Sequence, residues 1–428
     1  MRNTAIIDVR GRRVWDSRGW PTVEVDVITE GGGRGRAMAP GGMSTGSREA
    51  LELRDGGAAF GGKNVAGAVR GINDEVARAL RGHDAMDQEG CDARLVSLDG
   101  TPNLSRLGAN AIIATSMAVA HAAAHCASLP LWSHLRGGRA VQLPMPEVQI
   151  FGGGAHAAGA SRIQEFMIIP VGAHSYVEAL DWAAEVYRAA ALLLDEQGLR
   201  RGTADQGGYW PLDAGDEPTL ALIVRAIERA GLAPGRDIGI SMDVAATQLA
   251  VAGGYRLSGD RRMDAAEVSD LLERWLRRYP IVAIEDPLGE SDFDGMRAIT
   301  AAIGDRVEII GDDFLGTRAS RVEEAARGGA CNTALIKPSQ AGTLTAARAA
   351  FDAARTAGWN AVVSGRSGDT EDTTVMHLAV GWGATQIKVG AFARSERMAK
   401  WNEGIRIAEA SGGDGLLPAR SQFPWSHG

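Results

Sequence analysis

The feature that most constrains this chain is a short apolar run that ends in two adjacent acids, IVAIEDP at residues 281–287. A run of this length, rich in β-branched residues, predicts a fully buried strand. A carboxylate at the carboxyl end of such a strand is where a β/α barrel places a metal ligand or a catalytic acid. Glu285 therefore marks one expected strand end at the mouth of a barrel.

Two further apolar runs end in the same way. One covers residues 238–243 and ends at Asp243, and the other covers residues 307–313 and includes Asp312. Helix-length segments separate the runs, so we expect their carboxyl ends to meet at one rim. Three carboxylates at one rim suit a hard divalent cation such as Mg²⁺. In the alternative reading each acid only caps the following helix, which explains three acids in series less well.

A fourth run, residues 332–337, ends in Lys337 instead of an acid. A nearby divalent cation disfavours the ammonium form of a lysine. Such a lysine can act as a base near neutral pH. The rim is thus expected to combine metal ligands with a proton acceptor.

The rest of the chain predicts two domains. Residues 5–29 alternate as strands do, and helical patterns follow up to about residue 135. The composition changes at residues 136–139, so we place an N-terminal α+β domain at 1–137 and a second domain at 138–428. In the second domain strand-like runs alternate with helices, expected near residues 176–197, 218–230 and 264–278, which predicts a closed parallel barrel. The Gly/Ser/Pro-rich end, about 411–428, is expected to be loose.

Composition narrows the class of protein. The net charge of -8 argues against a nucleic-acid or anionic-membrane partner. The three cysteines have no metal-site spacing, which suits a reducing cytoplasm. No signal peptide is expected, and polar residues interrupt the apolar stretch 109–127, so we interpret it as a buried helix. The sequence predicts a soluble cytoplasmic protein.

Several motifs together resemble one known family. They are DSRG at 16–19, PTVE at 21–24, EALELRD at 49–55, LGANAI at 107–112, QEFMI at 164–168, IEDP at 284–287, GDD at 311–313, LIK at 335–337 and RSER at 394–397. With these motifs the chain resembles the enolases over nearly its whole length. The resemblance implies an α/β protein in which an N-terminal α+β capping domain precedes a modified β/α (TIM-like) barrel. It also implies Mg²⁺ dependence and a homodimer.

The resemblance also implies roles for individual residues. Those for the metal ions are Asp243, Glu285 and Asp312 at a first Mg²⁺, and Ser44 at a second ion that binds with the substrate. Lys337 would remove the proton α to a carboxylate. A general solution for enolase-type sites is such a base beside Mg²⁺, because the dianionic intermediate needs concentrated positive charge.

Further roles concern the substrate. Lys388 would bind its carboxylate, while Arg366 and Ser367 would bind its phosphoryl group. His156 and Glu165 would lie near the leaving group, with Gln164 among the substrate-binding residues. These assignments imply a carbon–oxygen lyase that removes water from a small phosphorus-containing carboxylate.

Four departures from the family pattern fall in the site itself. Gln206 stands where enolases carry a glutamate credited with helping hydroxide leave, and an amide cannot protonate anything. Gly365 stands where they carry a histidine. The loop 40–46, a connector or a mobile lid, has Gly41-Gly42-Met43 in place of Ser-Gly-Ala. Lys337 is followed by Pro338-Ser339 instead of Val-Asn.

Three interpretations follow from these departures. The chain could be a housekeeping enolase, converting 2-phosphoglycerate to phosphoenolpyruvate, or a catalytically impaired scaffold or binding protein. We favour an active paralogue with an altered substrate, because the metal, base and carboxylate positions persist while bulk is lost at Gly365 and Gly41. Enolase relatives in phosphonate antibiotic pathways of the phosphinothricin type are thought to convert 2-phosphonoformylglycerate to carboxyphosphonoenolpyruvate. By analogy, this substrate is the expectation here.

Overall fold

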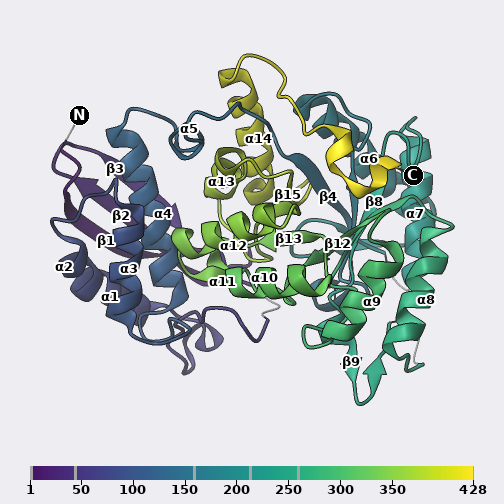
Figure 1. Cartoon of the computed structure of the whole chain (residues 1–428), viewed down its shortest axis with the longest axis horizontal. Helices are drawn as coiled ribbons and strands as arrows, with labels where there is room; N and C mark the ends of the chain where they lie inside the picture. The colour runs from purple at the N-terminus through teal and green to yellow at the C-terminus, as the bar shows by residue number, and fades with distance from the viewer. Residues whose placement is uncertain (1–2, 43–45, 158–160, 212–214, 258–260, 428) are drawn as a thin grey trace.

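The computed structural model describes residues 3–42, 46–157, 161–211, 215–257 and 261–427 (Figure 1). Its N-terminal part is an antiparallel sheet in the order β1-β2-β3, covered by helices. The elements are β1 (Ile6–Trp15), β2 (Pro21–Thr29), β3 (Arg34–Met38), α1 (Ala66–Gly71), α2 (Ala77–Leu80), α3 (Gln88–Asp99), α4 (Ala109–Cys126) and α5 (Leu131–Leu135), with short helical turns at Ala59–Gly62 and Ile72–Val76.

Helix α4 is the buried helix expected from residues 109–127, because nearly all its side chains are buried. It packs closely on the small sheet, since a Cβ atom at Gly35 would lie 1.9 Å from the Ala118 carbonyl oxygen. No helix within the described ranges is both long and apolar enough to cross a membrane.

The second part is a closed barrel of eight strands surrounded by helices, as expected (Figure 1). The barrel closes where the last strand pairs with the first. In order around the barrel the strands are β4 (Met145–Gly152), β5 (Glu165–Ile169), β8 (Gly239–Asp243), β11 (Ile281–Glu285), β12 (Glu308–Gly311), β13 (Thr333–Ile336), β14 (Asn360–Ser364) and β15 (Gln386–Ala391).

The prediction of an all-parallel barrel is wrong for one strand. Strand β5 runs antiparallel to both of its neighbours, β4 and β8. In the described part of the connection from β4 to β5 there is a short helical turn, Gly154–Ala157, and no crossover helix. Parallel neighbours need such a crossover, so the chain turns back directly. The first residue of β5 therefore lies at the same rim as the last residues of the other strands.

The three helices predicted in the second part, near 176–197, 218–230 and 264–278, agree with observed helices to within a few residues. Nine α-helices are described in this part. They are α6 (Tyr176–Glu196), α7 (Asp216–Arg229), α8 (Ala265–Leu276), α9 (Phe293–Ile303), α10 (Ala319–Gly328), α11 (Pro338–Ala341), α12 (Leu344–Thr356), α13 (Thr374–Trp382) and α14 (Ser395–Ala410). Side-chain caps begin several of them, for example Asp264, which forms a capping box with Glu267 at α8. Two short strand pairs complete the list, β6 (Arg200–Thr203) with β7 (Tyr209–Pro211), and β9 (Ala250–Val251) with β10 (Gly254–Tyr255).

The C-terminal segment is packed rather than loose. Leu417, Phe423 and Trp425 are buried, and the two aromatic rings stack with their centroids 4.2 Å apart. Asn360, the first residue of β14, donates from Nδ2 to the Gln422 carbonyl oxygen at 3.1 Å. The apolar side chains scattered among the glycines and serines thus hold the segment against the amino end of the barrel.

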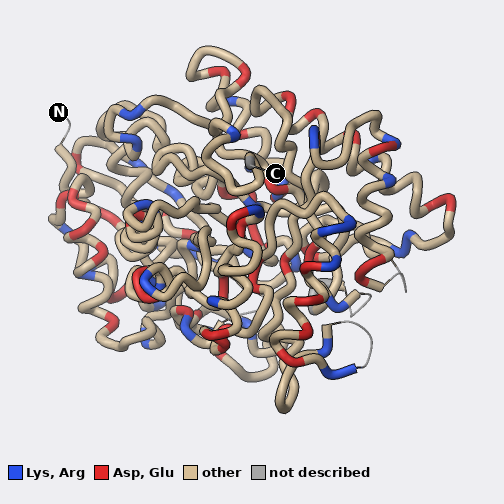
Figure 2. Tube along the Cα trace, turned by 45° about the vertical axis from the view of Figure 1, so that its right-hand side comes forward, with Lys and Arg blue, Asp and Glu red and all other residues tan. Residues whose placement is uncertain are grey.

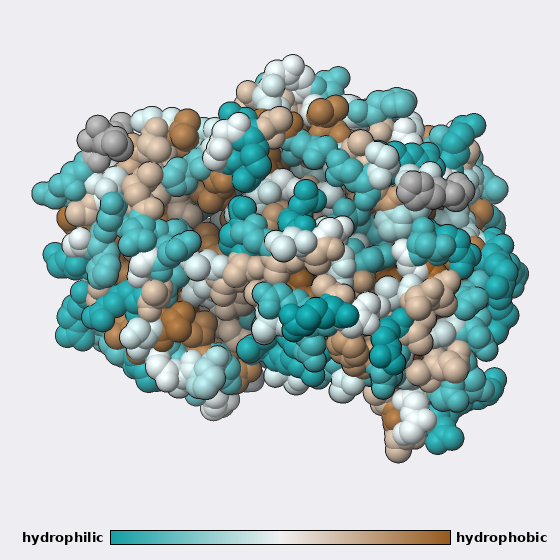
Figure 3. Space-filling view, in the orientation of Figure 1, coloured by the Kyte–Doolittle hydropathy of each residue, from teal (hydrophilic) through white to brown (hydrophobic). Residues whose placement is uncertain are grey.

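Charged residues of both signs occur throughout the described chain. Acidic and basic residues are interspersed along the chain (Figure 2), and the face seen in Figure 3 is mostly hydrophilic with scattered apolar patches.

The barrel interior holds two fully buried glutamates that sequence reasoning did not single out. Burial raises the pKa of Glu147 from 4.5 to about 7 and that of Glu308 from 4.5 to about 8. Ser241 donates to Glu147, and Thr333 and Asn360 donate to Glu308 Oε1 at 3.1 and 3.0 Å. Among the described residues, the Oε2 atom of each glutamate has no hydrogen-bond partner.

Because the pKa values of Glu147 and Glu308 are raised in the folded protein, we expect the free energy of unfolding to decline as the pH rises. The folded protein holds their protons more tightly than the unfolded chain does, so their contribution is complete below pH 4.5 and is lost as the pH rises through 7 and 8. The loss is of the order of 3 kcal/mol for Glu147. Scanning calorimetry between pH 5 and 8.5 should show a smaller decline for the Glu147→Gln/Glu308→Gln variant. An identical decline in wild type and variant would contradict it.

Candidate functional site

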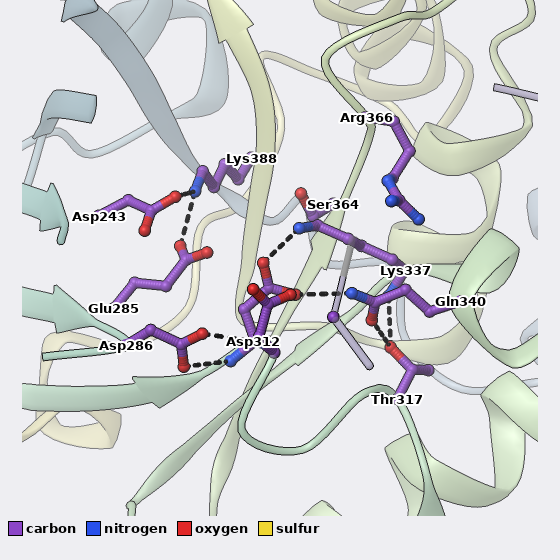
Figure 4. Close-up of polar contacts among 12 residues, drawn as sticks. Asp243, Glu285, Asp286, Asp312, Thr317, Lys337, Gln340, Ser364, Arg366 and Lys388 are labelled. Atoms are coloured by element: carbon purple, nitrogen blue, oxygen red, sulfur yellow. Dashed lines mark hydrogen bonds and ion pairs between the residues drawn. The ribbon is translucent and has the colours of Figure 1, made fainter. Parts of the chain in front are cut away.

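The strand ends bring the predicted residues together at one rim of the barrel (Figure 4). Asp243 and Glu285 end β8 and β11 and are partners in the strand register. Glu165 is also opposite Asp243, because the antiparallel β5 begins at this rim. Lys388 lies in β15 and Lys337 directly follows β13. Residues that are far apart in the sequence thus share one buried site.

Lys388 is the centre of an ion-pair cluster. Its Nζ lies 2.6 Å from Glu285 Oε2 and 3.1 Å from both Asp243 Oδ2 and Glu165 Oε2. Burial alone would lower the pKa of Lys388, but the carboxylates, led by Asp243, outweigh it and hold this pKa well above the ordinary value. The ammonium group therefore neutralises part of the negative charge at the rim.

Lys337 forms a second ion pair, with Asp312 Oδ2 (Figure 4). Burial disfavours the charged lysine, but the Asp312 carboxylate outweighs it and raises the pKa of Lys337 above the ordinary value. For Asp312, burial by itself would raise the pKa of the carboxyl group. The ion pair with Lys337 outweighs this effect and lowers that pKa. The surrounding residues by themselves thus favour the ammonium form, so the expected base form of Lys337 requires added positive charge nearby.

The carboxylates at the rim fit a divalent cation by their chemistry. Asp243, Glu285 and Asp312 offer hard oxygen ligands, and the buried Glu285 Oε1 atom has no hydrogen-bond partner among the described residues. Lys388 Nζ lies between Asp243 and Glu285, where a cationic group is already accommodated. These residues can therefore hold Mg²⁺.

The three carboxylates that lie closest together are not the three predicted metal ligands. Within the described residues, Asp286, Asp312 and Asp313 have ligand atoms within 4.8 Å of one another. Asp286 uses both of its carboxylate oxygens to accept the backbone N–H groups of Asp312 and Asp313, at 2.9 and 2.8 Å. Asp286 thus fixes the backbone that carries Asp312, and the Asp243, Glu285 and Asp312 ligand set stays a prediction.

Amide side chains line the opposite side of the site. Gln206 Nε2 donates to Glu165 Oε1, and Gln164 Nε2 donates to Asp243 Oδ2 at 3.0 Å. Gln206 therefore lies beside Glu165, the residue expected near the leaving group. In this position it acts as a hydrogen-bond donor, and its amide has no acidic proton to give.

Arg366 is held from the N-terminal domain. Its Nη1 atom donates to Glu49 Oε2 at 2.8 Å and to Ser339 Oγ at 3.1 Å. Gly42 approaches so closely that a Cβ atom there would lie 2.0 Å from Arg366 Nη2. Gly41 instead pairs through its backbone with Gly368. The space against Arg366 therefore depends on Gly42 rather than on Gly41.

Two predicted residues fall outside what can be described. Ser44 belongs to residues 43–45, and the side chain of His156 lies outside the described part of the chain. Their predicted roles stay predictions. The structure adds residues that sequence reasoning missed, namely Glu49, Gln340 and Asp286, all buried and in contact with predicted ones. The signals available were their places within or next to the motifs EALELRD, LIK and IEDP.

A polar pocket with about 310 Å³ of empty space joins most predicted residues, and its walls are formed by Gln164, Glu165, Gln206, Asp243, Lys337, Ser364, Gly365, Arg366, Ser367 and Lys388. A second, small cavity of about 30 Å³ adjoins it at Ser364 and Gly365. The second cavity is mostly apolar and lies between the N-terminal domain and the barrel. Gly365 lines both spaces, but a Cβ atom there would lie 2.9 Å from Asp369 Oδ2, so Asp369 occupies the direction in which a side chain would point.

Two family comparisons match this chain. The description "Enolase, N-terminal domain" matches residues 6–135, and "Enolase, C-terminal TIM barrel domain" matches residues 140–422. The matched ranges cover nearly the whole chain and include every strand of the rim. With the closed barrel, the small antiparallel sheet and the acid-and-lysine rim, they show that this protein is a member of the enolase family.

Proposed function

We propose that this protein is a Mg²⁺-dependent hydro-lyase that acts on a 2-phospho- or 2-phosphono-substituted glycerate. The observation that supports this most strongly is the pocket in which Lys337, Lys388 and Arg366 lie among buried carboxylates. Such a pocket combines anion binding with a proton acceptor. Membership of the enolase family also supports a lyase reaction of the enolase type.

The proposed reaction begins with the substrate carboxylate bound at Lys388 and the phosphorus group at Arg366 and Ser367. Asp243, Glu285 and Asp312 would hold Mg²⁺, which would supply positive charge near the substrate carboxylate and offset the charge of Asp312. Lys337 Nζ, as the free amine, then takes the proton α to the carboxylate. The hydroxyl group at the next carbon leaves as hydroxide, on the side of the pocket where Glu165 lies.

The proposed substrate is longer than 2-phosphoglycerate. Gln206 stands beside Glu165 where enolases carry a glutamate, so this side of the pocket has lost an acid. Gly365 stands where they carry a histidine, and it lines the second cavity. The residues proposed to surround the leaving group and the phosphorus group of the substrate therefore differ from those of enolases. We propose 2-phosphonoformylglycerate, converted to carboxyphosphonoenolpyruvate in phosphonate antibiotic biosynthesis. The homodimer, the cytoplasmic location and a small-molecule substrate as the partner are part of the same proposal.

The first test concerns the metal. Glu285→Ala should abolish tight Mg²⁺ binding measured by titration calorimetry, because it removes a central carboxylate ligand. Glu147→Gln is the matched control, since it changes another buried barrel glutamate outside the proposed ligand set and should keep the affinity. Unchanged Mg²⁺ affinity in Glu285→Ala would show that the ligand set is wrong.

The second test separates an enzyme from a scaffold. Exchange of the substrate α-proton with D₂O requires the base but no acid for the leaving group. We expect exchange in wild type and none in Lys337→Ala, followed by proton NMR, while Lys63→Ala, a change outside the pocket, should exchange as wild type does. A wild type that exchanges no proton of any 2-phospho- or 2-phosphono-acid favours the scaffold interpretation.

The third test concerns the substrate. Phosphorus NMR should show faster turnover of 2-phosphonoformylglycerate than of 2-phosphoglycerate. The Gln206→Glu/Gly365→His variant should raise 2-phosphoglycerate dehydration about tenfold or more, since general-acid help typically contributes 10²–10⁴-fold. A Cβ atom at residue 365 would lie 2.9 Å from Asp369 Oδ2, so the single Gln206→Glu variant is the control for crowding. Rapid wild-type turnover of 2-phosphoglycerate, unimproved in the variant, would indicate a housekeeping enolase.

A further inference from the structure

We propose that Gln340 is a positioning residue that fixes the orientation of Asp312 and connects it, through Glu49, to Arg366. This inference rests on the proposed roles of Asp312 as a metal ligand and Lys337 as the base. The backbone N–H of Gln340 donates to the Lys337 carbonyl oxygen at 2.9 Å, but the contacts described for its side chain are with Asp312, Glu49 and Thr317, so the effect of the amide must pass through these residues.

The side chain of Gln340 uses both ends of its amide. Its Nε2 atom donates to Asp312 Oδ1 at 2.9 Å and to Glu49 Oε1 at 3.2 Å. Its Oε1 atom accepts from Thr317 Oγ1 at 2.6 Å. Figure 4 shows Gln340 between Asp312 and Thr317. The residue is buried, so both amide protons and the carbonyl oxygen are satisfied by the protein.

Thr317 determines which way the amide points. Its hydroxyl oxygen accepts the backbone N–H of Lys337 at 3.0 Å, and its one hydroxyl proton goes to the Gln340 carbonyl oxygen. Turning the amide over would place its carbonyl oxygen against the carboxylates of Asp312 and Glu49, which cannot donate. The orientation of the amide is therefore fixed by its surroundings.

The amide lies between two carboxylates that each hold a cationic group. Asp312 contacts Gln340 through Oδ1 and Lys337 through Oδ2. Glu49 contacts Gln340 through Oε1 and Arg366 through Oε2, at 2.8 Å from Nη1. A continuous buried chain thus runs from Lys337 to Arg366.

Removing the amide donors would have a direct electrostatic consequence. Asp312 Oδ1 and Glu49 Oε1 would face each other without a proton between them, and two buried carboxylates repel. Rotation of Asp312 would relieve this repulsion, and it would move the oxygen that faces Lys337. Groups that orient metal ligands in this way are typically worth about 10–100-fold in metal affinity or activity.

The experiment uses variants of the full-length protein. Gln340→Met removes both donors at similar length. Thr317→Val removes the hydroxyl with little change of shape, and Thr317→Ser keeps it. We expect Gln340→Met to weaken Mg²⁺ binding about tenfold or more in calorimetry. It should also lower kcat for α-proton exchange about 10–100-fold, with KM within about threefold. Thr317→Val should change both in the same direction, and Thr317→Ser should match wild type.

The outcomes distinguish positioning from general destabilisation and from failure of the proposed function. A structural role alone would lower the melting temperature while the folded protein kept its Mg²⁺ affinity and kcat, and this result would overturn the inference. If wild type catalyses no exchange, the proposed function fails, but Mg²⁺ titration of Gln340→Met still decides the inference. If wild type also binds no Mg²⁺, a crystal structure of Gln340→Met decides: a rotated Asp312 supports the inference, and an unmoved Asp312 overturns it.

Discussion

Like charge buried in a small volume is the constraint on which the rest of this structure depends. Five carboxylates, Glu165, Asp243, Glu285, Asp286 and Asp312, lie buried at one rim of the barrel. Burying them without partners would be prohibitively costly, so each is met by an ammonium group, an amide or backbone N–H groups. Lys388 and Lys337 therefore serve folding as well as the proposed chemistry. A divalent cation would take over part of this compensation and free the lysines to contact substrate.

The two domains share the task of satisfying these charges. Glu49 belongs to the N-terminal domain, yet it holds Arg366 of the barrel, and its Oε1 atom also accepts the backbone N–H of Gly46 at 3.0 Å. That residue directly follows the segment that carries Ser44. One buried carboxylate thus links the end of this loop, the anion-binding arginine and, through Gln340, the barrel rim. The position of the N-terminal domain is therefore part of the site rather than only a cover.

Asp243, Glu285 and Lys337 could be placed at one rim from the sequence because each ends or follows an apolar run, and that signal is local. Glu285 and Asp243 needed only the rule that parallel strands end together. The direction of β5 was missed, since its own residues look like those of any buried strand. Glu49 and Gln340 were missed for a different reason: they meet across 291 positions of the sequence, and no local period indicates such a contact. Phe423 and Trp425 were overlooked because composition hides a few well-placed aromatic residues.

The substitutions in the site affect its two halves differently. On the base side, Lys337 and Asp312 keep a complete set of partners, including Gln340 and Thr317, which favours proton removal as the preserved step. On the leaving-group side, Glu165 is contacted by two donors, Lys388 at one oxygen and Gln206 at the other. A carboxylate held in this way accepts protons from its neighbours and has none positioned to give. The departure of hydroxide is therefore the step at which this site departs from the enolase pattern, because Gln206 has no acidic proton to give.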